Sequence, residues 1–266
     1  NAALGYQAGY SALGDKNVFI GYQAGYSETG SDKLYIDNSN TTSPLIYGDF
    51  STNMVDINGD LEVSGGHINP AVTIGLLSNG EMELSLALKY LIGQVMGAFI
   101  GVLIIYFHYL PHWDKTDDKK TKLGVFATSP AIDSKWSNLL SETVGTFALL
   151  FGLMFIGNDF AEGLKPIVVG GLVCAIGISL GGTTGYAINP VRDFIPRLVH
   201  SILPIKGKGD SNWSYSWIPV LGPILGGVLG VNVYEFLFNN SMSNAFVISS
   251  VLFLILIVLT FIENKD

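Results

Sequence analysis

The most constraining feature of this sequence is a short box that occurs twice, as Asn69-Pro70-Ala71 and as Asn189-Pro190-Val191, each time beside long apolar stretches. An Asn followed by Pro favours the start of a helix, because the Asn side chain can cap free backbone N–H groups and Pro has no N–H to satisfy. Two such boxes predict two short helices. If their N-termini face each other at the midplane of a bilayer, the positive dipole ends repel cations, including protons. The pattern favours a membrane pore.

Charge and cysteine content restrict the function classes. The 266 residues carry a formal net charge of -8, so the basic face that a nucleic-acid-binding protein needs is missing, and we expect no nucleic-acid partner. The one cysteine, Cys174, cannot form an internal disulfide. We expect its side chain to be buried as a small apolar group.

Residues 1–63 contain an internal repeat. The heptapeptide Gly5–Ser11 recurs as Gly21–Ser27, which gives a period of 16 residues (21 - 5). Short Gly-rich repeats are typical of stacked β-turns, and the apolar stretch Asn17–Gly21 is strand-like and too short for a helix. We therefore expect a small β-roll-like segment that cannot span a membrane.

From Ser64 onwards the apolar segments match bilayer spans of roughly 20 residues. The sequence predicts a mainly α membrane protein in which short helices at the two boxes accompany five long ones. The long helices are expected at 84–107, 139–156, 166–180, 217–238 and 245–262, and the short ones near 69–78 and 189–202.

The sequences "SGGHINPAVTIGL" and "GTTGYAINPVRDFIPRLV" resemble the two Asn-Pro-Ala boxes of the aquaporin and glycerol-facilitator family. The resemblance covers about residues 64–238 and includes "GQVMGAF", "SETVGTF" and "WIPVLGPILGG". It implies a partial aquaporin-like helical bundle with two re-entrant half-helices. It also implies an integral protein of the bacterial inner membrane and a homotetramer with one pore per subunit.

Two parts of the chain depart from that family. In residues 1–63 the repeat "NVFIGYQAGYS" and the following "LYIDNSNTTSPLIYGDFSTNMVDINGDLEV" resemble the heads of trimeric autotransporter adhesins and phage tail fibres. This segment stands where the family has two further helices, and a crossover at Val63–Gly66 is plausible. Without those helices, we expect the half-helix at 69–78 to expose one flank to lipid, with poor folding or leakage as the hypothesis. The domains expected are 1–63, a channel domain at 64–238, and an extra transmembrane helix within 239–266, which is expected to be a peripheral span, with a plug for part of the gap as the alternative.

Arg192 follows Asn189 by about one helical turn. An Arg at mid-membrane costs roughly 2.5 to 3.5 kcal/mol on insertion scales, so it should face water or a partner, unless it snorkels from a helix end. The resemblance implies that Arg192, Tyr186 and Gly177 form a selectivity constriction, with a fourth member on a missing helix. Arg192 would donate hydrogen bonds to the permeant, Tyr186 would give an apolar wall, and Gly177 would leave room for a carbon backbone.

Four further positions agree, in this resemblance, with glycerol-type rather than water-type members. The physical reason for this distinction is that a polyol needs hydrogen bonds on one side of its path and apolar contact on the other. An Asp in the first turn of a helix is also favourable with the dipole alone. The four positions are Asp193, Arg197, Pro219 and Val220.

Three polar residues have a supporting role in the resemblance. Glu142 lies in an apolar span, where an unpaired carboxylate is costly, and it would accept hydrogen bonds from backbone N–H groups of the second loop. A protonated, inert Glu142 near the helix end is the alternative. Gln94 would support the structure similarly, and His67 would orient the first loop, unless it is an interface histidine without consequence.

No enzyme site or cofactor is expected. There is no pairing of a nucleophile with a base and no Gly-rich phosphate loop after a strand. His108 and His112 have helical spacing, but Pro111 intervenes and no carboxylate accompanies them inside the bilayer, so no metal is expected.

Three interpretations follow. The first is a passive channel for glycerol or other small neutral polyols and water that excludes protons and ions, with the lipid bilayer as its surroundings. The alternative is a fibre- or adhesin-like binding or assembly fragment fused to a nonfunctional partial channel. A join that is an artefact or a nonfunctional recombinant is a third possibility.

Overall fold

The computed structural model describes residues 1–42, 44–52, 54–57, 66–159 and 164–265. Contacts divide the chain into two compact units, Asn1–Gly66 and His67–Asp266, and each is described by itself. The domain boundary expected after residue 63 lies outside the described residues.

The first unit contains a five-stranded sheet in the order β1-β2-β3-β4-β5. The first three strands are parallel and their register equals the sequence repeat, since Ala2 pairs with Val18 and Val18 pairs with Leu34. Equivalent side chains are therefore stacked, as in Tyr6 on Tyr22, whose ring centroids are 5.3 Å apart. The pairs β3–β4 and β4–β5 are antiparallel. The strands are β1 Ala2–Leu4, β2 Val18–Ile20, β3 Lys33–Ile36, β4 Ile46–Asp49 and β5 Met54–Ile57.

The core of this unit forms around Phe19, which is 1 % exposed. Gly9 and Gly25 flank its ring with φ angles of +61° and +59°, and a Cβ atom at either position would lie 2.4 or 2.1 Å from a ring carbon. The repeated glycines thus allow both a left-handed turn and close approach to the ring. The strand predicted at Asn17–Gly21 is present as β2.

The ion pair between Lys33 and Asp49 joins β3 to β4 and makes the first unit sensitive to acid. Lys33 Nζ lies 2.5 Å from Asp49 Oδ2, and Ser51 also donates to this carboxylate. These bonds hold the pKa of Asp49 at about 2, below its ordinary value of 3.8. A carboxyl with a depressed pKa stabilises the fold above its unfolded pKa and loses that contribution as the pH falls through the folded one.

We therefore expect the sheet to lose stability between about pH 4 and about pH 2, and Asp49→Asn to remove much of this dependence. Amide hydrogen exchange of β3 and β4 measures the effect. Wild type and variant are compared at each pH, so that the intrinsic exchange rates cancel. A difference between them that is the same at both ends of the range would contradict the prediction.

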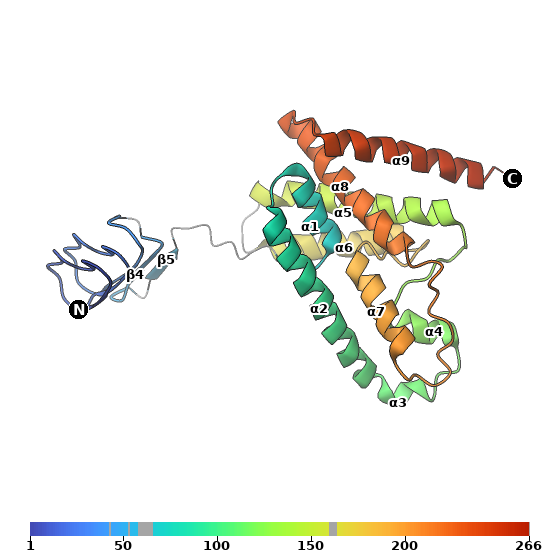
Figure 1. The fold of residues 1–266 in the computed structure, drawn as a ribbon, viewed down its shortest axis with the longest axis horizontal. Helices are drawn as coiled ribbons and strands as arrows, with labels where there is room; N and C mark the ends of the chain where they lie inside the picture. The colour runs from blue at the N-terminus through green and yellow to red at the C-terminus, as the bar shows by residue number, and fades with distance from the viewer. Residues whose placement is uncertain (43, 53, 58–65, 160–163, 266) are drawn as a thin grey trace. The chain divides into compact units, whose positions relative to one another are not determined.

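The second unit is a bundle of helices (Figure 1). In the part of the chain that the structure describes, four of them, α2, α5, α8 and α9, are long and apolar enough to cross a membrane, and α6 is a shorter apolar helix. Each long or short helix expected from the sequence corresponds to an observed one, whereas α3 and α4 are additional short helices. The bounds are α1 Pro70–Asn79, α2 Leu84–His108, α3 Leu110–Trp113, α4 Lys119–Gly124, α5 Lys135–Asp159, α6 Lys165–Leu180, α7 Pro190–Ile202, α8 Ile218–Asn239 and α9 Asn244–Glu263.

Glycines on α8 allow three helices to pack closely. A Cβ atom at Gly226 would lie 2.2 Å from the carbonyl oxygen of Thr143 on α5. One at Gly227 would lie 2.6 Å from the carbonyl oxygen of Ala71 on α1. Small residues let helix backbones approach each other in membrane proteins. Helix α8 therefore packs closely against both α5 and the first Asn-Pro box.

The expected burial of Cys174 is wrong, because this residue is exposed on α6. Apolar side chains such as Ile178 on α6 and Ile92 and Ile100 on α2 are exposed as well. In a membrane helix lipid is as apolar as the protein interior, so apolar character does not by itself predict burial.

Candidate functional site

The two Asn-Pro boxes meet through a reciprocal pair of hydrogen bonds. Asn69 Nδ2 donates to the carbonyl oxygen of Ile188 at 2.7 Å, and Asn189 Nδ2 donates to that of Ile68 at 2.8 Å. Each Asn also caps its own helix: Asn69 Oδ1 accepts from Ala71, and Asn189 Oδ1 accepts from Val191 and Arg192. Pro70 and Pro190 are the first residues of α1 and α7. The boxes thus bring the two helix N-termini together.

Glu142 on α5 holds the chain just before the second box. Its carboxylate is 1 % exposed and accepts from the N–H of Ala187 at 2.9 Å and of Ile188 at 2.8 Å. Ile188 has a φ of 41°, in the left-handed region, which is strained for a β-branched residue. The Ile188 N–H donates to the Glu142 carboxylate, and the Ile188 carbonyl oxygen accepts from the Asn69 side chain. The strained residue is therefore fixed from both sides.

Gln94 on α2 has a similar place beside the first box. Its Nε2 donates to the carbonyl oxygen of His67 and, at 2.9 Å, to Thr73 Oγ1. The His67 ring packs on Tyr90, with centroids 4.9 Å apart. Thr73 is fully buried and lies in α1, so α2 contacts both the loop before the box and the helix after it. No sequence motif marks Thr73 for this role.

Of the three residues expected at a constriction, the structure places two side by side. A Cβ atom at Gly177 on α6 would lie 2.9 Å from Tyr186 Cζ, and the Tyr186 side chain is 40 % exposed. Arg192 is exposed in the first turn of α7. Among the described residues its guanidinium has no hydrogen-bond partner, so its donors are available to a solute.

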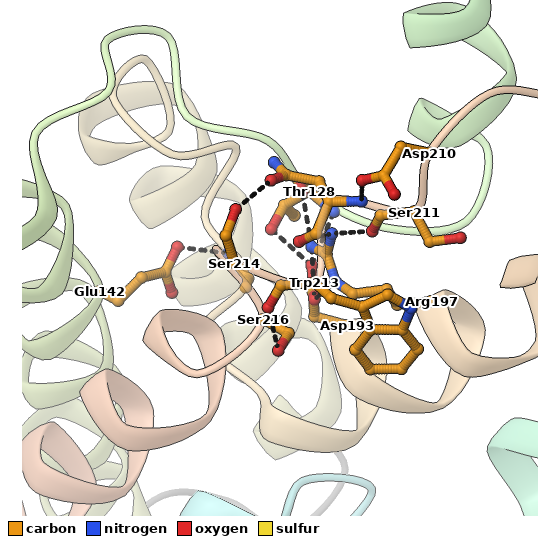
Figure 2. A network of polar contacts seen from close by, with 11 residues as sticks. Thr128, Glu142, Asp193, Arg197, Asp210, Ser211, Trp213, Ser214 and Ser216 are labelled. Carbon is orange, nitrogen blue, oxygen red and sulfur yellow. Dashed lines mark hydrogen bonds and ion pairs between the residues drawn. The ribbon is translucent and has the colours of Figure 1, made fainter.

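Asp193 and Arg197 form a fully buried ion pair on α7, with Nη2 of Arg197 2.7 Å from Oδ1 of Asp193. Oδ2 of Asp193 accepts from the N–H of Thr128 at 2.7 Å and from its hydroxyl at 2.6 Å. Arg197 in turn donates to the carbonyl oxygens of Thr128, Ser211 and Asn212. Figure 2 shows this group, with Glu142 approaching from a separate helix. The pair ties α7 to the loops before α5 and before α8.

Pro219 and Val220 lie in the first turn of α8, and Pro219 is buried. The loop before them carries Tyr215, whose ring lies 5.7 Å from the Arg197 guanidinium carbon. Burial raises the pKa of Tyr215, so this ring stays neutral beside the ion pair. The start of α8 is therefore next to the Asp193–Arg197 pair.

Lys208 is a support that the sequence analysis missed. Its Nζ donates at 2.7 Å to each of the carbonyl oxygens of His200, Ser201 and Leu203, which are the free acceptors at the end of α7. A cation is favourable there with the helix dipole. Burial lowers the pKa of Lys208. No sequence pattern connects this lysine with a helix end several residues earlier.

The two histidines at helical spacing, His108 and His112, both pack on Tyr109, with ring centroids 5.3 and 5.4 Å away. Across the described ranges no group of three or more His, Cys, Asp or Glu side chains could hold a metal ion.

The sequence matches the major intrinsic protein family over residues 18–234. The chain belongs to the major intrinsic protein family. It is 51 % identical over 205 residues to a glycerol uptake facilitator protein of Bacillus subtilis (strain 168), which covers 77 % of this chain and 75 % of that protein. It is 56 % identical over 177 residues to a probable glycerol uptake facilitator protein of Thermotoga maritima, and this match covers 66 % of this chain and 76 % of that protein.

A solved structure agrees with this membership. The aquaglyceroporin from Plasmodium falciparum matches with a TM-score of 0.59 and 28 % identity, over 66 % of this chain and 74 % of that one. Members of the major intrinsic protein family are integral membrane channels and not enzymes. The resemblance of residues 1–63 to adhesin heads and tail fibres is not borne out, because the family match begins at residue 18, inside that segment.

Proposed function

We propose that this major intrinsic protein is a passive channel of the bacterial inner membrane for glycerol and other small neutral polyols, and that it also passes water and excludes protons and ions. The reciprocal bonds between Asn69 and Ile188 and between Asn189 and Ile68 carry the proposal. They bring the positive ends of two helix dipoles to one place, where a cation is disfavoured. The similarity to glycerol uptake facilitators supports glycerol as the permeant.

Helices α1 and α7 are proposed to be re-entrant half-helices. They have 10 and 13 residues. At a rise of about 1.5 Å per residue they are about 15 and 20 Å long, less than the hydrocarbon thickness of about 30 Å. Backbone ends at membrane depth must be buried in protein or face water. The caps by Asn69 and Asn189 and the bonds from Glu142 supply such protection.

Selection is assigned to Arg192, Tyr186 and Gly177. The free guanidinium donors of Arg192 suit the hydroxyl groups of a polyol, and the exposed ring of Tyr186 suits its CH groups. Gly177 has no side chain, so the Tyr186 ring packs directly against the backbone of α6 at this position. The buried Asp193–Arg197 pair, Pro219 and Val220 act behind this wall by fixing α7 and the start of α8, and Gln94 and His67 do the same for α1.

Assembly and the first unit complete the proposal. We assign a homotetramer with one pore per subunit, supported by the apolar side chains that α2 and α6 expose, such as Ile100 and Ile178. Light scattering of the detergent-solubilised protein measures the subunit number.

We assign a β-roll-like arrangement to the repeats, supported by the parallel pairing of β1, β2 and β3 in the register of the repeat.

Gly177→Val tests the constriction. The added side chain pushes against the Tyr186 ring, whose Cζ would lie 2.9 Å from the new Cβ. We expect glycerol permeability to fall by about ten-fold or more, since one extra methylene in a fitted pocket already has an effect of this size and valine adds three carbon atoms. Water permeability should fall less, because water is smaller. Stopped-flow light scattering of proteoliposomes under glycerol and sucrose gradients measures both.

Gly171→Val on the same helix is the matched control, because a Cβ atom there meets nothing within 4 Å. If wild-type liposomes take up glycerol no faster than empty ones, the proposed channel is wrong. If Gly177→Val and Gly171→Val give the same ratio of glycerol to water permeability, the channel stands and the assignment of Gly177 and Tyr186 fails.

A further inference from the structure

The last helix, α9, caps the start of α5 with a carboxylate. Glu263 Oε1 accepts from the N–H of Lys135 at 2.8 Å, and Oε2 accepts from those of Trp136 at 2.9 Å and Ser137 at 3.2 Å. The Ser134 hydroxyl donates to the same carboxylate at 2.6 Å. Three free N–H groups at the N-terminus of α5 are thus satisfied by a residue 128 positions from Lys135.

This cap replaces the local one that a helix normally has. Ser134 precedes α5 and is a residue type that often caps through its own oxygen, but here its hydroxyl is a donor to Glu263. A negative charge at a helix N-terminus is also favourable with the dipole. Asn264 adds a further bond to Ser137 Oγ at 2.8 Å. The end of α9 is therefore fastened to the first turn of α5.

The other end of α9 is fastened to α8 and, through it, to the C-terminal end of α1. Ser243, which precedes α9, donates to Asn232 Oδ1 at 2.5 Å. Asn232 is buried on α8, and its Nδ2 donates at 2.8 Å to Ser78 Oγ in α1. Helix α9 thus has polar attachments at both ends, to α5 and to α8, while most of the side chains between them are exposed.

Between these ends the contact of α9 is apolar and incomplete. Leu256 packs with Leu139 of α5 and Ile218 of α8. Beside them an apolar cavity of about 550 Å³ separates parts of α9 from α5 and α8, and Leu252 and Leu225 are among its lining residues. Apolar contact has no direction and would allow α9 to slide, so the bonds at the two ends define its position.

The capped turn of α5 is close along the helix to Glu142. Residues 135 and 142 are seven apart, about two turns, and lie on one face of the helix. A shift of α5 along its axis therefore moves the carboxylate that holds the N–H groups of Ala187 and Ile188. We propose that Glu263 is a positioning residue of the channel, which acts through the N-terminus of α5 and Glu142 on the strained loop before Asn189. This inference rests on the proposed function.

The test compares Glu263→Ala and Glu263→Gln with wild type in the full chain reconstituted into liposomes. A merely structural loss lowers glycerol and water permeability in proportion to the amount of folded protein. A displaced loop changes their ratio, and we expect a change of about two-fold or more, the usual size for mutations that act through a network. The smaller change Glu263→Gln keeps one acceptor oxygen, and its permeability ratio is measured in place of that of Glu263→Ala if Glu263→Ala does not fold. Lys265→Ala, in an exposed neighbour, is the matched control and should leave the ratio unchanged.

A second substitution tests the route. Ser134→Asp supplies a local carboxylate to the same N–H groups and should restore the ratio in the Glu263→Ala background. An unchanged ratio in Glu263→Ala and Glu263→Gln would overturn the proposal, and failure of Ser134→Asp to restore a changed ratio would overturn the route through α5.

Amide hydrogen exchange of residues 185–189 keeps this test separate from the proposed function. If wild type conducts no glycerol, the channel proposal fails, and faster exchange of this loop in Glu263→Ala still supports the positioning role. Equal exchange in wild type and Glu263→Ala would then overturn it.

Discussion

Replacement of Arg197 by Ala is expected to destabilise the protein by about 3 to 5 kcal/mol, the usual effect of breaking a buried ion pair from one side. The variant leaves the carboxylate of Asp193 in a fully buried place without its cation. It also removes the donors to the carbonyl oxygens of Thr128, Ser211 and Asn212. The loops before α5 and α8 should therefore detach from α7.

Unfolding in mixed micelles with increasing denaturing detergent measures this loss. Arg192→Ala is the matched control, because it removes a cation from the same helix at an exposed position and should change stability little. The double variant Asp193→Ala/Arg197→Ala should lose less than the sum of the single changes, since no unpaired charge remains. Equal stability of Arg197→Ala and Arg192→Ala would show that the buried pair does not hold these loops.

Gly226→Ala is the second large effect. The added Cβ would lie 2.2 Å from the carbonyl oxygen of Thr143 and 2.9 Å from the backbone nitrogen of Phe147. These are backbone atoms of α5, so the clash can be relieved only by moving the two helices apart. Overpacking of a fitted core costs typically about 1 to 3 kcal/mol, and a backbone clash belongs at the upper end. Because Glu142 lies beside Thr143, we expect glycerol conduction to fall together with stability.

The comparison variant is Gly171→Ala on α6, where a Cβ atom meets nothing within 4 Å. Alanine favours a helix over glycine by about 1 kcal/mol, so this change should be neutral or stabilising. Thermal denaturation and folded yield in detergent measure both variants. A Gly226→Ala protein that melts at or above the temperature of Gly171→Ala would mean that α5 and α8 are not in close contact there.

The helices were predictable because their signals are local. Long apolar runs identify α2, α5, α8 and α9, and the Asn-Pro pairs mark the first residues of α1 and α7. Where the end of a helix depends on a distant partner, the helix boundary predicted from the sequence was less accurate. Helix α5 begins at Lys135, whereas the apolar run predicted Leu139, because Glu263 caps the additional turn.

The site was predictable only in part, for the same physical reason. The sequence singled out Asn69, Asn189 and Glu142, but their roles in conduction stay predictions. It gave no signal for the left-handed conformation of Ile188, since this residue type disfavours such a φ and is held there by two side chains from elsewhere in the fold. The cap by Lys208 was missed for a similar reason. Such contacts become visible only when the chain is folded.

The reciprocal bonds of the two boxes also determine which way a water molecule can face. The side-chain Oδ1 of each Asn accepts from the first turn of its own helix. One side-chain N–H of each Asn donates to the carbonyl oxygen of the residue just before the other box. An amide nitrogen carries two N–H groups, so one N–H donor remains on each Asn, whereas Asn189 Oδ1 already accepts two hydrogen bonds and Asn69 Oδ1 accepts one. In the proposed pore, we expect a water molecule between Asn69 and Asn189 to accept from both N–H donors and to point its own hydrogens towards opposite ends. We therefore expect the water column of the proposed pore to reverse its polarity at this point, so that a proton is not handed along it from one side to the other.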